Sequence, residues 1–267
     1  MIDGVEQRER APGRALVEAG ELVAGSMARG AAGLLFDPAP ARVRLDAGLA
    51  AWLRRTADAA DTEPPSPAST RGRCRAGAAL AFATELSVTR AAQGRTVRTD
   101  AYLLPGPGER APADEVGEAV LLAARATAEE WRVRHLGYLL AEAAVSPDLD
   151  PAVVHRGLRL ATGLTGRQWV LLAAVGRRER VPLPMTPVPQ DPRGWTAWGA
   201  LEDLAELQRD GLLDPPPATP RPGGAALPRL RPADLRLTRR GVLVHRLLAL
   251  DFVRDRAVAD ALADLAG

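Results

Sequence analysis

Apolar residues recur at the spacing of α-helices along most of the chain. Side chains three or four positions apart share one face of a helix, so such runs indicate helices with one buried face. The pattern predicts helices over residues 14–36, 43–60, 74–94, 114–145, 151–163 and 166–176. Proline-rich breaks over residues 61–72 and 105–113 separate some of them. The greater part of the chain is therefore expected to be helical.

The segment 195–250 changes this pattern. A helix is expected from its first residue, with the hydroxyl of Thr196 capping the N-terminal end. Gly211 follows the last apolar position, where a left-handed glycine can end a helix. Short strands are expected at residues 212–213 and 235–238, on either side of a proline-rich loop.

A last helix is expected over residues 241–253, capped by Thr238. Helix, short hairpin and helix in this order are typical of the second half of a winged-helix module. The sequence thus predicts a mainly α protein, with a helical N-terminal part followed by a winged-helix-like C-terminal module that contains a short β-hairpin. The expected domains are residues 1–110, of unknown role, and residues 111–267, with the long helix and the winged-helix-like part.

Composition limits the chemistry of the chain. Only 4% of the residues are aromatic, so the core must be built largely from Leu, Val and Ala. There is no Lys, and all 35 basic residues are Arg, against 33 acidic residues. A GC-rich genome that favours Ala, Arg, Gly and Pro codons accounts for this usage. The formal net charge of +2 does not by itself indicate a nucleic-acid-binding protein.

A cytoplasmic location is expected from three features. The single cysteine, Cys74, excludes an intramolecular disulfide. Residues 1–10 are polar and lack the apolar core of a signal peptide. The chain contains no run of about 18 uncharged apolar residues, so no membrane span is predicted.

No motif predicts an enzyme, a cofactor or a metal site. Without Lys there is no P-loop or Schiff-base lysine, and Gly-x-Ser-x-Gly is also absent. None of His135, His155 and His245 has a second histidine four positions on, and His135 is expected to be a core or interface residue. Cys74 lies between two arginines, which can lower a thiol pKa, but no motif supplies a base. A site assembled from residues that no motif reveals stays an alternative.

Charge divides the predicted winged-helix module. Its first helix, which in DNA-binding relatives of this fold enters the major groove, is acidic and would repel phosphates. Its acids are therefore candidates for contact with a protein: Glu202, Asp203, Glu206 and Asp210. The predicted wing and the start of the last helix are basic. Their candidates for phosphate contact, in an alternative function, are Arg229, Arg231, Arg236, Arg239 and Arg240.

Four segments also suggest a family. They are LLAEAAVSPDLD, LTGRQWVLLAAV, ALEDLAELQRDGLL and LRLTRRGVLVHRLL, in this order. A long helix ending in Leu-Leu-Ala, a helix opening after Leu-Thr, and a Leu-Thr-x-x-Gly return into a helix resemble the Abi-alpha family of uncharacterised bacterial proteins. The resemblance covers roughly residues 115–250. It implies an association with abortive infection of phage, and it supplies no catalytic residues.

Two functions follow as expectations. The first is a non-enzymatic interaction or regulatory protein, related to phage defence through the resemblance, that binds a protein partner or self-associates through a winged-helix scaffold. The alternative is a DNA-binding transcriptional regulator that grips phosphate with the arginine-rich wing. Salt dependence would distinguish them, because phosphate contacts release counterions and weaken steeply with salt.

Overall fold

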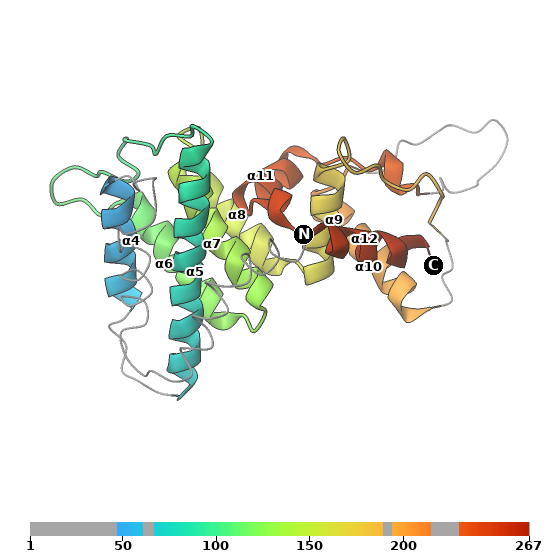
Figure 1. The fold of residues 1–267 in the computed structure, drawn as a ribbon, viewed down its shortest axis with the longest axis horizontal. Coiled ribbons are helices and arrows are strands. Elements are labelled where there is room, and N and C mark those ends of the chain that lie inside the picture. Colours follow the sequence, from blue (N-terminus) through green and yellow to red (C-terminus); the bar gives the residue numbers. More distant parts are fainter. Residues whose placement is uncertain (1–46, 61–66, 189–193, 215–229, 267) are drawn as a thin grey trace, which may run out of the picture. The chain divides into compact units, whose positions relative to one another are not determined.

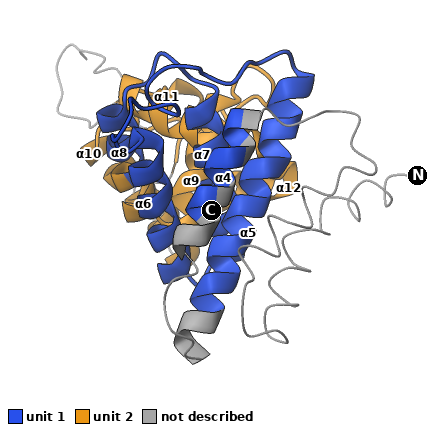
Figure 2. Cartoon of the chain, turned by 90° about the vertical axis from the view of Figure 1, so that its left-hand side faces the viewer, with its two compact units in different colours: residues 1–158 blue, residues 159–267 orange. Residues whose placement is uncertain are grey.

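The structure of this protein is a computed structural model that describes residues 47–60, 67–188, 194–214 and 230–266 (Figure 1). The predicted helix over residues 14–36 lies outside these residues. The chain divides into two compact units, residues 1–158 and 159–267 (Figure 2). The predicted domain boundary, between residues 110 and 111, falls inside the first unit.

Unit 1 is a cluster of packed helices. Its described helices are α4 (Ala47–Ala60), α5 (Pro67–Ala92), α6 (Pro112–Ala126) and α7 (Glu130–Ala144), and α8 (Pro151–Gly163) spans the boundary between the two units. Helix α5 packs against both α6 and α7, and α4 packs against α5 and α6. The predicted domain boundary therefore separates helices that share one core.

Small residues let α5 and α7 approach each other closely. An ideal Cβ at Gly137 of α7 would lie 2.2 Å from the backbone oxygen of Ala79 in α5, so only glycine fits there. The buried residues around this crossing are mainly Leu and Ala, among them Leu80, Ala83 and Leu140. The expected core of Leu, Val and Ala is confirmed, and it depends on short distances between helix axes.

Two helix boundaries in unit 1 differ from the prediction. The single helix expected over residues 114–145 is broken, because Thr127 and Glu129 have extended backbones between α6 and α7. The Thr127 hydroxyl accepts a hydrogen bond from the Glu129 N–H (3.2 Å), which replaces a helical bond with a local turn. Helix α5 begins at Pro67, inside the predicted linker over residues 61–72.

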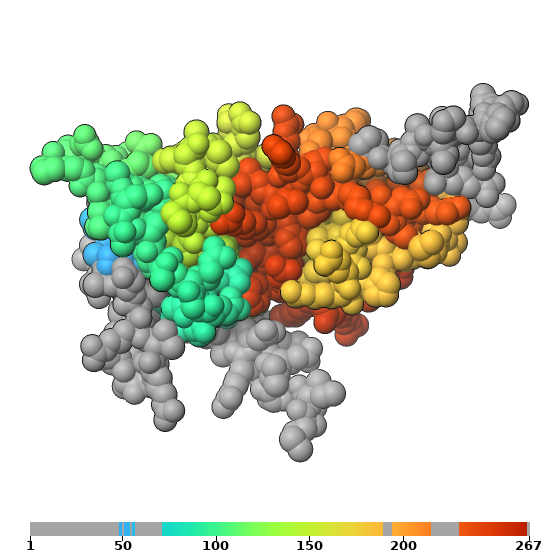
Figure 3. Space-filling view, turned by 90° about the horizontal axis from the view of Figure 1, so that it is seen from above, coloured from blue at the N-terminus to red at the C-terminus, as the bar shows by residue number. Residues whose placement is uncertain are grey.

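Arg98 connects the loop between α5 and α6 to the residues that follow α7 through hydrogen bonds. This loop, in green, projects at the edge of unit 1 (Figures 1 and 3). The buried guanidinium donates to the carbonyl oxygens of Ser146 (3.2 Å) and Leu149 (2.8 Å) and to both oxygens of Asp100. The hydrogen bond from Arg98 lowers the pKa of Asp100. Burial raises the pKa of Tyr102, whose ring lies 4.2 Å from the guanidinium carbon.

Unit 2 is built around α9 (Gly166–Gly176). Helices α10 (Trp195–Arg209), α11 (Arg239–Leu247) and α12 (Asp255–Ala266) all contact it. Thr165 caps α9 by accepting from the Gln168 N–H, and the side-chain oxygen of Gln168 accepts from the Thr165 N–H, which completes a capping box. The fully buried Trp169 donates its indole N–H to the Ala161 carbonyl (3.1 Å).

The predicted β-hairpin is wrong. The described residues contain no strand, and segments 212–213 and 235–238 meet only in an isolated antiparallel bridge between Leu213 and Leu237. A 3₁₀ turn, η1 (Pro232–Asp234), precedes the second segment, and Thr238 already caps α11, so too few extended residues are left for a ladder. The described residues of unit 2 therefore do not form a winged-helix module with a hairpin wing.

The ends of the helices in this region are partly as predicted. Thr238 caps α11 by accepting from the Gly241 N–H (3.1 Å), and Gly211 follows α10 with a φ of 67°. Thr196 is not a cap, because the N-cap of α10 is Gly194. The predicted helix over residues 241–253 stops at Leu247, because Ala249 adopts a left-handed backbone (φ 46°). The 3₁₀ turn η2 (Leu250–Phe252) follows, and then α12, which is not among the predicted helices.

Arg177 joins the end of α9 to the start of α12. Its buried guanidinium donates to the carbonyl oxygens of Leu250 (2.7 Å) and Val253, and to the Asp255 carboxylate (3.0 Å). His245 of α11 lies against Gly176, where a Cβ would come within 2.2 Å of its Nε2 atom. Burial lowers the pKa of His245, while the charge of Asp251 raises it and that of Arg177 lowers it.

The α5–α7 crossing predicts a selective glycine effect. The change Gly137→Ala places a methyl group against a backbone carbonyl, and we expect it to lower the free energy of unfolding by about 1–3 kcal/mol or more. Gly72→Ala in α5 is the control, because its nearest new contact is the flexible Arg125 side chain at 3.4 Å. Gly72→Ala should leave stability unchanged or raise it slightly. Equal urea midpoints for the two variants would contradict the close approach.

His245 predicts a pH effect on stability. Because its folded-state pKa lies below the ordinary value near 6.5, the unfolded chain binds the proton first as pH falls. The free energy of unfolding should therefore decrease between pH 7.5 and 5.5, and less so in His245→Gln. Urea melts of both proteins across this range measure the difference. Parallel pH profiles would show that His245 is not held neutral.

Candidate functional site

Two tryptophans at the start of α10 are exposed together. Trp195 is 87% and Trp198 49% exposed, and their rings meet edge to face with centroids 6.0 Å apart. Exposed large apolar side chains in clusters mark interaction surfaces more often than isolated ones do. In a chain with five tryptophans, this pair is the strongest apolar surface feature of unit 2 among the described residues.

The tryptophans continue into a row of acids. Trp195, Trp198, Glu202 and Glu206 lie three or four positions apart and thus share one face of α10, here called the α10 stripe. Glu202 is exposed, and Glu206 is exposed although it accepts a hydrogen bond from Gln168 Nε2 (2.6 Å). The stripe is therefore apolar at the start of the helix and negative towards its end.

Asp203 has a different role from the neighbouring acids. It was predicted as an interaction residue, yet it is only 7% exposed and faces α9. Its oxygens accept from the hydroxyl of Thr165 (3.1 Å) and from Nε of Arg167 (2.5 Å). Asp210 is exposed at the end of α10. Of the four predicted acids, the structure thus places Glu202 and Glu206 on one surface with the tryptophans.

Arg167 fixes the first turn of α10 to its neighbours. Besides its ion pair with Asp203, it donates to the Thr196 carbonyl (3.3 Å) and lies 3.9 Å from the Asp264 carboxylate of α12. An ideal Cβ at Gly199 would fall 2.6 Å from its Nη2 atom. One guanidinium therefore links α9, α10 and α12 next to the first turn of α10, which carries the tryptophan pair.

The predicted phosphate-contact arginines lie around the start of α11. Arg229 lies outside the described residues, while Arg231, Arg236, Arg239 and Arg240 are all exposed. Arg236 donates to the carbonyls of Ala233 and Leu235, each at 2.8 Å, and Arg240 to the carbonyl of Asp210 at 3.4 Å. Two of these guanidinium groups thus contact the protein's own backbone.

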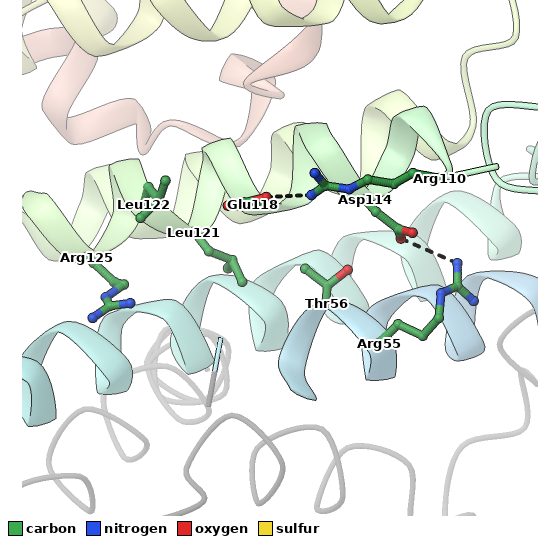
Figure 4. Close-up of a pocket in the computed structure, with 8 residues that line it drawn as sticks. All are labelled: Arg55, Thr56, Arg110, Asp114, Glu118, Leu121, Leu122 and Arg125. Atoms are coloured by element: carbon green, nitrogen blue, oxygen red, sulfur yellow. Dashed lines mark hydrogen bonds and ion pairs between the residues drawn. The ribbon is translucent and has the colours of Figure 1, made fainter. Parts of the chain in front are cut away.

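Unit 1 contains a groove of about 420 Å³ between α4 and α6 (Figure 4). Four of its five charged residues form two pairs, Arg55 with Asp114 (3.4 Å) and Arg110 with Glu118 (2.5 Å), and the fifth is Arg125. The hydrogen bond that the exposed Arg110 donates to Glu118 raises the pKa of Arg110. Because a guanidinium engages each carboxylate, the groove does not present the separated acid and base that proton transfer needs.

Two other candidates from the sequence are buried. His135 is buried against the edge of Tyr138, as predicted for a core residue, and Cys74 is buried as well. Within the described residues, no three His, Cys, Asp or Glu side chains come together to hold a metal ion. No described helix has the length and hydropathy to cross a membrane.

The exposed tryptophan pair was missed at the level of sequence. Trp198 fits the apolar spacing of α10 and is therefore expected on its buried face. Leu207, which is fully buried, lies nine positions further on, which is two and a half helical turns, so the two residues point to opposite sides. If the leucines near the end of α10 define its buried face, the helical spacing places Trp198 on the exposed face.

Comparison of the chain with protein-family models, with curated proteins and with solved structures finds no match. The resemblance to the Abi-alpha family therefore stays a prediction, and the function must be argued from the surface itself.

The buried and the exposed acids of α10 predict effects of different size on stability. Asp203→Asn removes a charged partner from Arg167, so we expect the free energy of unfolding to fall by about 1–3 kcal/mol. Glu202→Gln changes an exposed neighbour in the same way and should shift it by less than about 0.5 kcal/mol. Urea unfolding of both variants is the measurement. A loss at Glu202 as large as that at Asp203 would contradict the inward orientation of Asp203.

Proposed function

We propose that this chain is a non-enzymatic interaction protein whose α10 stripe binds a protein partner. The observation that carries the proposal is the pair of neighbouring exposed indoles at Trp195 and Trp198. Tryptophan is enriched among the few residues that supply most of the binding energy of interfaces, because its large rigid ring buries much area at little cost in entropy.

The anchoring of the pair supports the same proposal. Arg167 holds the first turn of α10 through the Thr196 carbonyl and Asp203, so the helix that carries the indoles is fixed before a partner arrives. A surface that is already ordered loses less conformational entropy on binding. A role in abortive infection of phage, which the family resemblance implies, belongs to this proposal.

The acids next to the indoles bear on the choice of partner. Glu202 and Glu206 would lie close to phosphates if nucleic acid were bound at the α10 stripe, and that contact is repulsive. The alternative function, phosphate binding, would instead use the exposed arginines near α11. Because Arg236 and Arg240 already contact backbone carbonyls, protein contact is the better-supported function.

Affinity capture with the full chain tests the proposal. The double variant Trp195→Ala/Trp198→Ala should lose the proteins that the wild type retains from a nuclease-treated lysate of the source organism. Truncation of two central tryptophans commonly weakens binding by about 2 kcal/mol or more, which is roughly thirtyfold. Met185→Ala removes an apolar side chain of similar exposure elsewhere in unit 2 and should retain the same proteins.

Two outcomes would count against the proposal. Identical captured proteins for the wild type and the double tryptophan variant would show that the indoles are not the contact. Proteins that are captured only from an untreated lysate, and whose capture depends on Arg239 and Arg240 rather than on the tryptophans, would favour the phosphate-binding alternative.

A further inference from the structure

The exposed side of α11 carries the opposite charge to that of α10. Arg239, Val242 and Arg246 lie three and four positions apart and share one face of α11, here called the α11 stripe. Val242 is 53% exposed, Arg239 is exposed and Arg246 is half-buried. This face is therefore an exposed apolar side chain flanked by two guanidinium groups.

The two stripes have complementary chemistry. The α10 stripe combines indoles with carboxylates, and the α11 stripe combines an aliphatic side chain with guanidinium groups. Apolar side chains can meet across such a pair of surfaces while acids meet bases, which favours the correct pairing and its register. Since Trp195, Glu202, Arg239 and Val242 are all exposed, the stripes do not cover each other within one chain.

We infer that the partner of the α10 stripe is a second copy of this chain, in a two-fold dimer where each α10 stripe contacts the other copy's α11 stripe. The inference rests on the proposed function and adds the identity of the partner. A two-fold arrangement uses both stripes of both copies and leaves neither open for further addition.

The size of the stripes supports the reciprocal arrangement. A tryptophan buries roughly 150–250 Å² when it is fully enclosed, so the pair supplies on the order of 300 Å². A stable interface buries about 800 Å² on each partner. One α10 stripe is therefore too small alone, and the addition of the α11 stripe on each copy brings the contact towards the required area.

Sedimentation velocity of the full chain tests the inference. We expect a dimer at micromolar concentration in low salt, weakened by Trp195→Ala/Trp198→Ala. High salt should also weaken it, because at about 1 M the screening length falls to about 3 Å. A mass that stays monomeric at all concentrations in low salt would overturn the inference.

A charge-swap pair gives the sharpest test. The variant Glu202→Arg places a base on the α10 stripe opposite the basic α11 stripe. The variant Arg239→Glu places an acid on the α11 stripe opposite the acidic α10 stripe. Each variant alone should therefore dimerise about tenfold more weakly. Mixed together, the two variants again place acid opposite base in both contacts, and the dimer should return as a heterodimer. Glu179→Arg, the same charge change at an exposed loop position of unit 2, should leave wild-type dimerisation unchanged.

The outcomes separate this inference from the proposed function. A monomer that still captures another protein through the tryptophans would overturn the second copy as partner and leave the proposed function standing. A monomer without tryptophan-dependent capture would overturn both. Three results would reject the paired stripes as the dimer interface. The dimer could persist in the double tryptophan variant, or fail to return when the two charge variants are mixed. Glu179→Arg could also weaken dimerisation as much as Glu202→Arg does.

Discussion

Arginine guanidinium groups join the helices in both units, and those of Arg98 and Arg177 are buried. Arg98 donates to carbonyls that follow α7, and Arg177 donates to one carbonyl within η2 and one just after it. The partly exposed Arg167 donates to a carbonyl in the first turn of α10. Helix ends leave backbone carbonyls without intrahelical partners, and one guanidinium can donate to several of them at once. In a chain with few aromatic residues, these contacts add polar restraints to a core of small apolar side chains, and the orientation of the tryptophan pair depends on one of them.

The sequence predicted helices well where a local signal marks them. The caps at Thr165 and Thr238 and the left-handed Gly211 each depend on a residue type whose chemistry is readable one position at a time. The hairpin failed because a strand depends on a partner segment, and here only one bridge forms. The left-handed backbone at Ala249 could not be predicted, since alanine carries no preference for that conformation.

Only part of the candidate surface could be predicted from the sequence. The acids of α10 are evident from the sequence, but periodicity alone does not show that Asp203 turns inward, because its burial depends on Arg167 in a different helix. Trp198 is expected in the core because apolar residues are normally buried, and exposure of large ones is the exception that marks function. Whether a tryptophan of α10 is buried or exposed depends on where the neighbouring helices pack, and the sequence of α10 alone does not give their positions.

The contacts around the Leu213–Leu237 bridge have a consequence for engineering the chain. The amide of Asp214 donates to the Arg236 carbonyl (2.8 Å) and that of Thr238 to the Leu212 carbonyl (3.1 Å), so the chain leaves and returns at adjacent points. Closing a longer loop between fixed ends costs only about 0.6 kcal/mol for each doubling of its length. An insertion ahead of Leu230, whose carbonyl accepts from the Val188 amide (2.8 Å), would therefore add a fluorescent domain or an affinity tag at little cost in loop entropy while α10 and α11 stay in register.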